Sequence, residues 1–353
     1  MAENRPVVLE ASQVVTCPGE PGPRRGEGMS RIGLVEDGAV AIADGRLLAV
    51  GQRGELRSRY PEAERIDLTG HVLAPGLVDS HTHAVFGRWR VDEYELRCAG
   101  KTYAEIAQTG GGINASVIDL RRRSEDELVE LTRPRLRQML THGTTTAEVK
   151  SGYGLTLEDE LKMLRVIRRI GKEGWIDLVP TFLGAHAVPP EYRDRRIDYI
   201  DLLVSEMIPV VAESGLAVFC DVFMEPGAFT ADETSKVLQA AVDHGLVPRL
   251  HADEFETSGG AELAAELGAA SADHLAAITE AGVSALASSD TVATLLPGTL
   301  LFLGRTGYAP ARTLIDSGAA VALATDFNPG SSPTVNLQLV MSLACSQMGI
   351  SPA

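Results

Sequence analysis

Positive charge, cysteine and long apolar runs are all scarce in this sequence. Its 353 residues include 32 Lys and Arg against 48 Asp and Glu, which gives a formal net charge of −16. Binding a phosphate backbone requires a basic face, so we expect no nucleic-acid partner. An anionic small molecule would need a local cationic side chain, because the acidic chain as a whole offers it no attraction.

Cysteines and hydrophobic segments restrict the cellular setting. The four cysteines, Cys17, Cys98, Cys220 and Cys345, are far apart and form no CxxC pair, so a disulfide framework is not expected. No apolar run reaches membrane-spanning length, and no basic segment followed by an apolar stretch stands at the N-terminus. We therefore expect a protein of the reducing cytoplasm with no membrane partner.

Two kinds of segment follow each other along the chain. Residues 1–70 contain short strands and are predicted to form a small β domain. Within them, Ala39–Ala43 and Arg46–Val50 flank the turn pair Asp44–Gly45, which predicts a β-hairpin. Residues 71–353 alternate apolar segments with amphipathic helices, such as one over 157–171 with leucines and isoleucines at spacings of three and four.

The second segment contains eight candidate strands. They lie at 72–79, 143–150, 178–185, 217–224, 246–252, 269–274, 291–296 and 320–326. Eight strand–helix repeats predict an α/β fold, a TIM-like parallel (β/α)8 barrel. The alternative is an open doubly wound sheet, which would carry a glycine-rich nucleotide fingerprint after its first strand, and this sequence has none there.

Ionisable residues gather where these strands end. His81 and His83 close the first strand and project from one face of it, because alternate side chains of a strand point the same way. In (β/α)8 barrels the active site lies at the carboxyl ends of the strands. Five of the eight histidines, and one aspartate, fall at such ends: His81, His83, His186, His251, His274 and Asp326.

Part of this set is suited to a metal ion. Three imidazoles and a carboxylate, from His81, His83, His251 and Asp326, favour Zn²⁺ or Fe²⁺, with Mn²⁺ a weaker alternative. Such an ion would make hydroxide available near neutral pH. We expect one ion, because the fourth strand ends in "CDVFMEPG" and offers no lysine for carboxylation as a bridging ligand. Lys150 on the second strand is predicted to be a buried ion-pair partner.

Longer motifs around these residues resemble a known family. "PGLVDSHTH", "LHADE", "SADH" and "ATDFNPGSSP" are similar to motifs of the amidohydrolase superfamily, and "EVKSGYGL", "TFLGAHAVPPEY" and "GGGI" narrow the resemblance to the imidazolonepropionase family. The resemblance runs from about residue 35 to residue 353. It implies hydrolysis of the cyclic amide of 4-imidazolone-5-propanoate to N-formimidoyl-L-glutamate, in histidine degradation, by an enzyme with one divalent ion, Zn or Fe. A homodimer is a further expectation from the family.

The resemblance also implies roles for individual residues. Arg90, within "FGRWRVDEYELR", would hold the substrate carboxylate, and Arg88 competes because this stretch departs from the family's usual "FGGSR". The other implied substrate contacts are Tyr103, Tyr153, His186, Glu254, Asn328, Gly330 and Ser331. The implied catalytic residues are Glu254, His274 and Asp326, and the sequence leaves open which of them is the first general base.

The small domain is the part in which this chain departs from the family. The resemblance implies a small β-sandwich domain beside the barrel, completed by residues beyond the barrel. This chain stops at "SQMGISPA", so we expect that domain to be incomplete. Two rival functions stay open. The chain is another amidohydrolase acting on a small heterocycle, or, because it stops early, a truncated chain that binds metal without turnover.

Overall fold

The computed structural model describes residues 5–19, 21–101, 105–106 and 110–352. The chain divides into two compact units, of which the first ends at Gly76 and the second spans Leu77–Pro352. The boundary expected after residue 70 falls inside strand β5 (Glu64–Leu73), which pairs with β1 (Val7–Val15) in the first unit.

The first unit is built on one five-stranded sheet. Its elements are β1 (Val7–Val15), a 3-10 turn η1 (Gly26–Ser30), β2 (Leu34–Glu36), β3 (Gly38–Ala43), β4 (Arg46–Gln52), α1 (Arg53–Arg59) and β5 (Glu64–Leu73). β1 pairs antiparallel with β2 and β3 and parallel with β5. The predicted hairpin is confirmed as β3–β4, with Asp44 and Gly45 at φ 52° and 71°, as its tight turn requires. The strands described for this unit all belong to this sheet, and the second layer of the expected sandwich is not among them.

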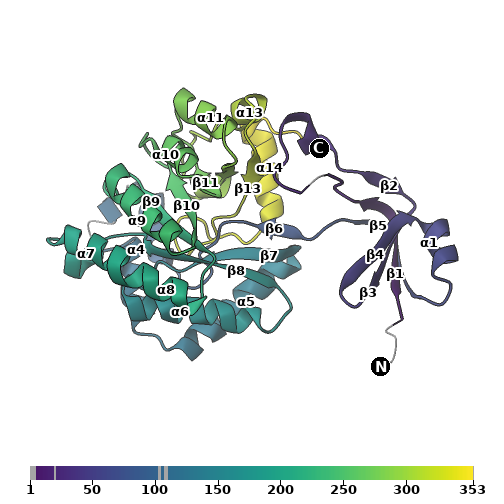
Figure 1. The fold of residues 1–353 in the computed structure, drawn as a ribbon, viewed down its shortest axis with the longest axis horizontal. Helices are drawn as coiled ribbons and strands as arrows, with labels where there is room; N and C mark the ends of the chain where they lie inside the picture. Colours follow the sequence, from purple (N-terminus) through teal and green to yellow (C-terminus); the bar gives the residue numbers. More distant parts are fainter. Residues whose placement is uncertain (1–4, 20, 102–104, 107–109, 353) are drawn as a thin grey trace. The chain divides into compact units, whose positions relative to one another are not determined.

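The second unit contains the eight predicted parallel strands (Figure 1). They are β6 (Leu77–Asp79), β7 (Thr144–Lys150), β8 (Asp177–Ala185), β9 (Phe219–Met224), β10 (Val247–Ala252), β11 (Ser271–His274), β12 (Val292–Leu295) and β13 (Val321–Leu323). Each pairs with the next along the chain, which confirms the barrel. The apolar run at 72–79, predicted as one strand, is two elements: its first two residues end β5, and β6 begins at Leu77.

The barrel closes at its carboxyl rim, where β6 and β13 have already ended. There Thr82 and Phe327 form a parallel bridge. The amide of Asp326 donates to the carbonyl of His81 at 3.0 Å, and the amide of His83 donates to the carbonyl of Phe327 at 2.8 Å. These bonds place the two-histidine segment directly beside the segment that carries Asp326.

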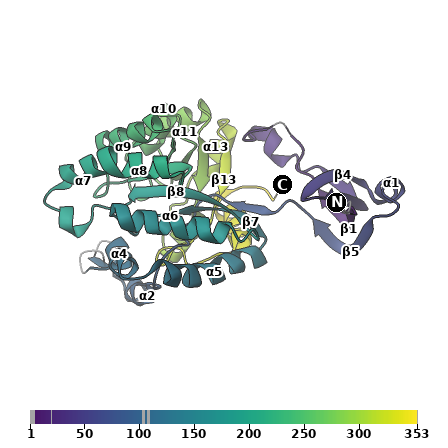
Figure 2. The same cartoon turned by 60° about the horizontal axis from the view of Figure 1, so that its bottom comes forward.

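Helices cover the outside of these strands (Figure 2). They are α2 (Val91–Cys98), α4 (Ile113–Arg121), α5 (Glu125–Thr141), α6 (Leu157–Gly171), η2 (Pro190–Tyr192), α7 (Arg196–Leu202), the π-helical turn η3 (Leu203–Met207), α8 (Ile208–Ser214), α9 (Ala231–Asp243), α10 (Gly260–Glu266), α11 (Glu280–Ala287), α12 (Pro297–Phe302), α13 (Ala311–Asp316) and α14 (Leu337–Met348). The predicted helix over 157–171 is confirmed as α6. Ser124 opens α5 through a capping box with Glu127, which satisfies two amides at the helix start.

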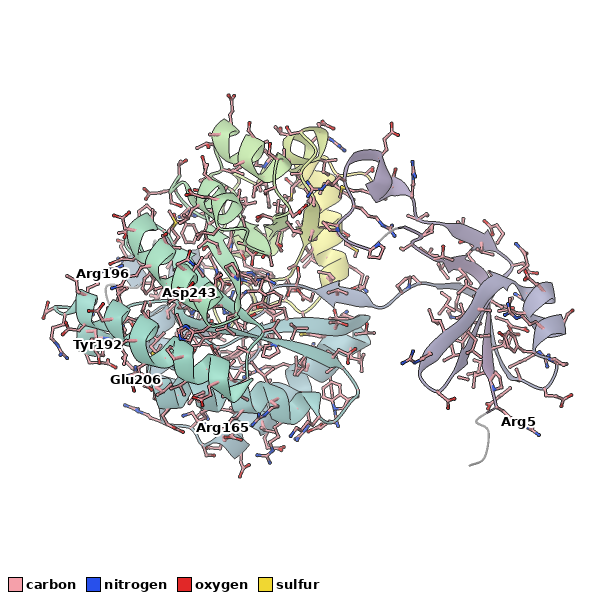
Figure 3. The ribbon with its side chains drawn as sticks, in the orientation of Figure 1. Arg5, Arg165, Tyr192, Arg196, Glu206 and Asp243 are labelled. Atoms are coloured by element: carbon pink, nitrogen blue, oxygen red, sulfur yellow. The ribbon has the colours of Figure 1, made fainter. Side chains whose placement is uncertain are left out.

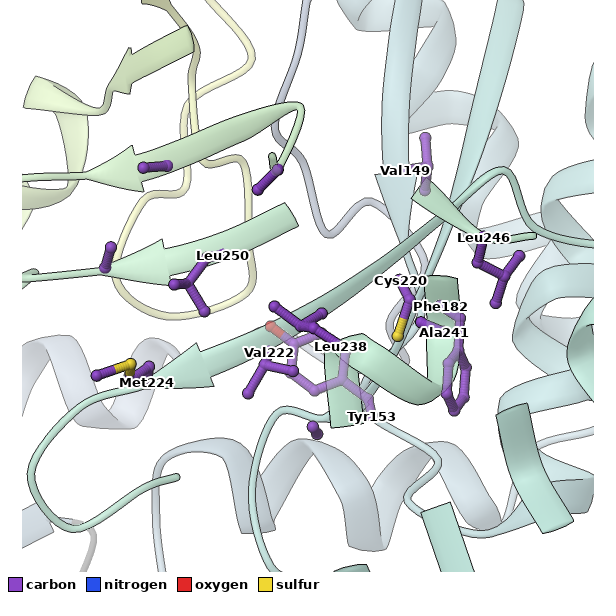
Figure 4. Close-up of a cluster of buried hydrophobic side chains, with 14 of the residues drawn as sticks. Val149, Tyr153, Phe182, Cys220, Val222, Met224, Leu238, Ala241, Leu246 and Leu250 are labelled. Carbon is purple, nitrogen blue, oxygen red and sulfur yellow. The ribbon is translucent and has the colours of Figure 1, made fainter. Parts of the chain in front are cut away.

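The main hydrophobic core lies between the strands and these helices. Figure 4 shows part of it, with Val222 of β9 near Leu238 of α9, and Cys220 of β9 near Ala241 of α9, all of them buried. Charged side chains such as Glu206 and Asp243 lie exposed on the helical layer (Figure 3). Among the residues that the structure describes, no helix combines the length and apolarity needed to cross a membrane.

Candidate active site

A small pocket at the carboxyl rim of the barrel gathers most of the predicted site residues. Its volume is about 40 Å³. Its polar and aromatic lining consists of His83, Arg90, Tyr153, His186, Phe223, His251, Glu254, Phe255, His274, Asp326, Asn328 and Ser331. His81 lies fully buried beneath this lining. Tyr103, predicted as a substrate contact, lies outside the described residues.

Buried carboxylates orient two of the histidines. Nδ1 of His81 lies 2.6 Å from Asp273, and Nδ1 of His251 lies 3.1 Å from Asp221. A carboxylate fixes the proton on Nδ1, which leaves Nε2 with its lone pair. The Nε2 atoms of His81 and His251 are buried and have no hydrogen-bond partner among the described residues.

These carboxylates are neutralised by two buried cations. Lys150 Nζ lies 2.8 Å from Asp221 and 2.9 Å from Glu148, which confirms its prediction as a buried ion-pair partner. Arg249 lies 2.9 Å from Asp273. Burial by itself would raise the pKa of Asp273, but the charges of Arg249 and His81 hold it well below its ordinary value. Asp273 therefore stays ionised and keeps His81 in one orientation.

Asp326 lies against the two-histidine segment. Its Oδ1 is 3.5 Å from His81 Nε2 and 3.4 Å from His83 Nε2. Its Oδ2 accepts a hydrogen bond from Thr299 Oγ1 at 2.5 Å. The φ of Asp326 is 52°, a left-handed conformation that side chains other than glycine rarely adopt and that is concentrated at functional sites.

The donor set fits a divalent metal ion. Ligand atoms of His81, His83 and Asp326 lie within 4.8 Å of one another, and so do those of His81, His251 and His274. Burial lowers the pKa of His81 and of His83 well below 6.5, so both rings are neutral and their lone pairs are available. The predicted ligands thus fall into two groups that share His81, one with His83 and Asp326 and the other with His251 and His274. The unpartnered Nε2 atoms are the observation that an ion would explain.

Glu254 and His274 form a second pair on the pocket wall. His274 Nδ1 lies 3.7 Å from a Glu254 carboxylate oxygen. Burial, followed by the charges of Asp326 and Glu225, raises the pKa of Glu254 well above its ordinary value. Glu225 accepts hydrogen bonds from the amides of residues 254, 255 and 256, so the loop that carries Glu254 is fixed from β9.

Arg90 is the cation of the inner pocket. Its Nε lies 3.2 Å from Glu93, and its Nη1 donates to Ser116 Oγ at 2.9 Å. Glu93 in turn accepts from the amide of Gly112 at 2.7 Å, which ties Arg90 to the glycine-rich loop. Arg88, the competing candidate, is exposed and lies 3.5 Å from Asp92, away from the pocket lining. The geometry therefore favours Arg90 as an anion anchor.

Tyr153 and His186 line the same pocket, and their ring centres lie 5.3 Å apart. The amides of Gly152, Gly154 and Leu155 donate to the buried carboxylate of Glu160, which fixes the loop on both sides of Tyr153. His186 Nδ1 lies 2.9 Å from the carbonyl of Gly152.

Asn328 shapes the loop after β13. Its Oδ1 accepts from the amides of Gly330 and Ser331, and its Nδ2 donates to the carbonyl of Asp326. Asn328 and Ser331 line the pocket, whereas Gly330 does not. Gly330 instead gives space to Arg90, because a Cβ at that position would lie 2.0 Å from Arg90 Nη2.

The sequence analysis missed five acidic residues that support the pocket. Each has a buried carboxylate that fixes a site residue or its loop: Glu93, Glu160, Asp221, Glu225 and Asp273. A signal was present for two of them, since Asp221 and Asp273 interrupt apolar strands, where an unpaired charge is unfavourable. The glutamates stand in helices and loops, where they resemble ordinary surface residues.

Comparison with protein families gives two matches. Residues 72–352 match the amidohydrolase family, and residues 38–63 match an imidazolonepropionase-like composite domain of bacteria. Among curated proteins, the imidazolonepropionase of Geobacillus kaustophilus is 50% identical over 351 residues, covering 98% of this chain and 82% of that protein. That of Myxococcus xanthus is 48% identical over 350 residues, with the same coverage of 98% and 82%.

Solved structures agree on the fold. A triazine hydrolase variant superposes with a TM-score of 0.71 at 18% identity, over 97% of this chain and 76% of that one. E. coli guanine deaminase gives a TM-score of 0.69 at 14% identity, over 96% and 77%. An adenosine deaminase of Xanthomonas campestris, solved with bound zinc, gives 0.60 at 18% identity, over 95% and 72%.

Proposed function

Because the chain belongs to the imidazolonepropionase family of amidohydrolases, we propose that it hydrolyses 4-imidazolone-5-propanoate to N-formimidoyl-L-glutamate. One observation carries this proposal beyond family membership. The same small pocket holds Arg90, a buried cation suited to a carboxylate, and the cluster of His83, His251 and Asp326. A ring with a propanoate tail would have both of its ends matched there.

We propose that His81, His83, His251 and Asp326 hold one divalent ion, either zinc or iron. The uncompensated Nε2 atoms of His81 and His251 support this assignment. Histidine and carboxylate ligands suit both metals. When bound, such an ion lowers the pKa of a water toward neutrality and supplies a hydroxide.

The remaining groups act on protons and on the position of the ring. Arg90 holds the propanoate, and Tyr153 and His186 confine the ring. Asp326, next to His83 and fixed by Thr299, accepts the proton of the attacking water. The carbonyl carbon gains the water oxygen and its bond to the ring nitrogen breaks. Glu254, whose pKa burial raises well above its ordinary value, supplies the proton that this nitrogen takes, and its neighbour His274 lies 3.7 Å from the Glu254 carboxylate.

The first test is hydrolysis of 4-imidazolone-5-propanoate by the purified chain, with bound metal quantified in the same sample. We expect turnover with about one ion per chain, as in single-ion hydrolase sites. The same imidazolone without its propanoate should react far more slowly, because Arg90 then has no partner. Equal rates on both compounds would reject the substrate assignment in favour of another small heterocycle.

Asp326→Asn provides the mechanistic control. The amide is nearly isosteric but cannot take a proton, so kcat should fall by at least about 10³-fold, the scale of losing an acid–base group. Circular dichroism should show the fold of the unchanged chain. Retained turnover in this variant would contradict the assigned role of Asp326.

A further inference from the structure

A larger cavity adjoins the inner pocket and is not explained by the residues assigned above. Its volume is about 620 Å³, against about 40 Å³ for the inner pocket. Ile113, His186, Phe223 and Phe255 line both, so the two are continuous. Small-molecule sites usually enclose roughly 300–1,000 Å³. The inner pocket alone is far below that range, and the larger cavity, which we call the vestibule, adds space beside it for a ligand.

Two arginines that line the vestibule differ from the third in their contacts. Arg193 follows η2, and Arg305 lies in the loop between α12 and α13; both are exposed and line the cavity. Neither side chain has a hydrogen-bond or ion-pair partner among the described residues. Arg196, which is labelled in Figure 3, also lines the vestibule. It differs because its Nε lies 2.6 Å from a carboxylate oxygen of Glu233.

Arg305 is held at the junction between the two cavities. Its guanidinium lies 4.4 Å from the ring centre of Phe255, a cation–π contact, and Phe255 lines both cavities. The N–H groups of this guanidinium donate to no residue that the structure describes, so they are available to a ligand. An unpaired, positioned guanidinium next to a pocket is suited to a carboxylate.

The acidic groups of the vestibule do not cancel these cations. Glu225 is turned toward the loop over residues 254–256, where three amides donate to its carboxylate. Glu256 is the other acidic residue in the described lining, and it is exposed to solvent. Arg193 and Arg305 are therefore the charges that a ligand in the cavity can pair with.

We propose that the vestibule is a carboxylate-binding site, in which Arg193 and Arg305 capture the anionic substrate before its carboxylate passes to Arg90. This inference rests on the proposed function for the identity of the substrate. A chain of net charge −16 repels anions at long range, so a local cationic entrance raises the encounter rate where it is needed. The capture step forms and breaks no covalent bond.

The test compares Arg193→Gln/Arg305→Gln with the unchanged chain at several salt concentrations. At about 20 mM ionic strength we expect kcat/KM to fall roughly 5- to 20-fold, within the range of electrostatic steering. The difference should shrink to less than about 2-fold near 0.5 M salt, where screening is nearly complete. Arg305→Lys should restore part of the loss, because it keeps the charge without the planar fork.

The matched control is Arg168→Gln. Arg168 is exposed on α6, has no side-chain partner among the described residues, and lies outside both cavities. The Arg168→Gln substitution removes one positive charge, as each vestibule substitution does. It should not alter the salt dependence of kcat/KM. The proposal is overturned if the double variant behaves like this control. It is also overturned if the double variant loses activity equally at every salt concentration.

Binding of glutarate separates this proposal from the proposed function. Calorimetry in an Arg90→Gln background, where the inner anchor is absent, should show weaker glutarate binding when Arg193 and Arg305 are also replaced. If the chain hydrolyses the imidazolone but its glutarate binding is unchanged by these substitutions, the proposed carboxylate site in the vestibule is wrong and the proposed function stands. An inactive chain whose glutarate binding depends on both arginines would overturn the substrate and retain the carboxylate site.

Discussion

At the scale of single residues, the inner anion anchor depends on a glycine that makes room for it. A methyl group at Gly330 would lie 2.0 Å from Arg90 Nη2 and 2.5 Å from its Cζ. The guanidinium would have to move and give up its contacts with Glu93 and Ser116. We expect Gly330→Ala to raise KM for the imidazolone by about 10-fold or more, the scale of a charged hydrogen bond, with kcat much less affected.

Steady-state kinetics with Gly171→Ala as the control test this prediction. Gly171 closes α6, and a methyl group there would lie at an ordinary 3.7 Å from Leu178. Its KM should stay that of the unchanged chain. Equal KM values in the two variants would show that the space above Gly330 does not set the position of Arg90.

The carboxylates behind the histidines should control metal retention. Asp221→Asn and Asp273→Asn replace the charged carboxylates that face Nδ1 of His251 and of His81 with neutral amides. Loss of such partners typically weakens metal binding by about 10- to 100-fold. Metal content after dialysis against a graded chelator should fall in both variants. Asp159→Asn, which changes a carboxylate of α6 outside the pocket lining, should keep its metal.

The sequence predicted the site residues at the strand ends better than the buried carboxylates that orient them. His81, His83, His251 and Asp326 were predicted because parallel strands bring their carboxyl ends to one rim. Asp221 and Asp273 were missed, because their partners, Lys150 and His81 among them, lie on other strands. Which strands are neighbours in a barrel follows from topology, but which side chains meet inside it depends on packing.

At the scale of elements, the sequence predicted which strands and helices are present better than it predicted their first and last residues. All eight strands and α6 were predicted, because long apolar runs and helical spacing are strong signals. The run at 72–79 was divided because residues 74–76, which belong to no strand, separate two sheets. The strand predicted to end at residue 326 ends at Leu323. The amide of Ala324 still donates to Leu295 of β12, but that of Asp326 donates to His81 instead.

The junction of β1 and α1 should be sensitive to acid. Arg57 of α1 donates to both oxygens of Glu10 of β1, at 2.8 and 2.7 Å. These hydrogen bonds hold the pKa of Glu10 below its ordinary 4.5. A carboxyl whose pKa is lower in the folded chain than in the unfolded chain stabilises the folded state. That contribution is complete at pH values above the pKa in the unfolded chain. That contribution is lost as the pH falls through the lower, folded-state pKa.

We therefore expect Glu10→Gln to flatten the pH dependence of unfolding below about pH 4.5. The measurement is thermal unfolding by circular dichroism between pH 3 and pH 7, with Glu55→Gln as the control. Glu55 is an exposed carboxylate on α1 that lies outside this pair. A Glu10→Gln profile that still falls as steeply as that of the Glu55→Gln control would show that the pair contributes nothing to acid sensitivity.

At the scale of the whole molecule, the metal should stabilise the fold as well as complete the site. Without an ion, the buried His81 Nε2 and His251 Nε2 are desolvated and have no hydrogen-bond partner among the described residues. A ligand that binds only the folded chain stabilises it in proportion to ln(1 + [L]/Kd). At 100 times the Kd this is about 2.7 kcal/mol, and for a chain of this size we expect the melting temperature to rise by roughly 5 °C.

The measurement compares chelator-treated protein with the same protein after addition of zinc. The control matters because a chain of net charge −16 also attracts divalent cations to its surface. A His81→Ala/His83→Ala variant keeps those surface carboxylates but loses two ligands of the cluster. We expect its melting temperature not to respond to zinc. An equal rise in both proteins would place the stabilising ions on the acidic surface and remove the thermodynamic support for the metal centre.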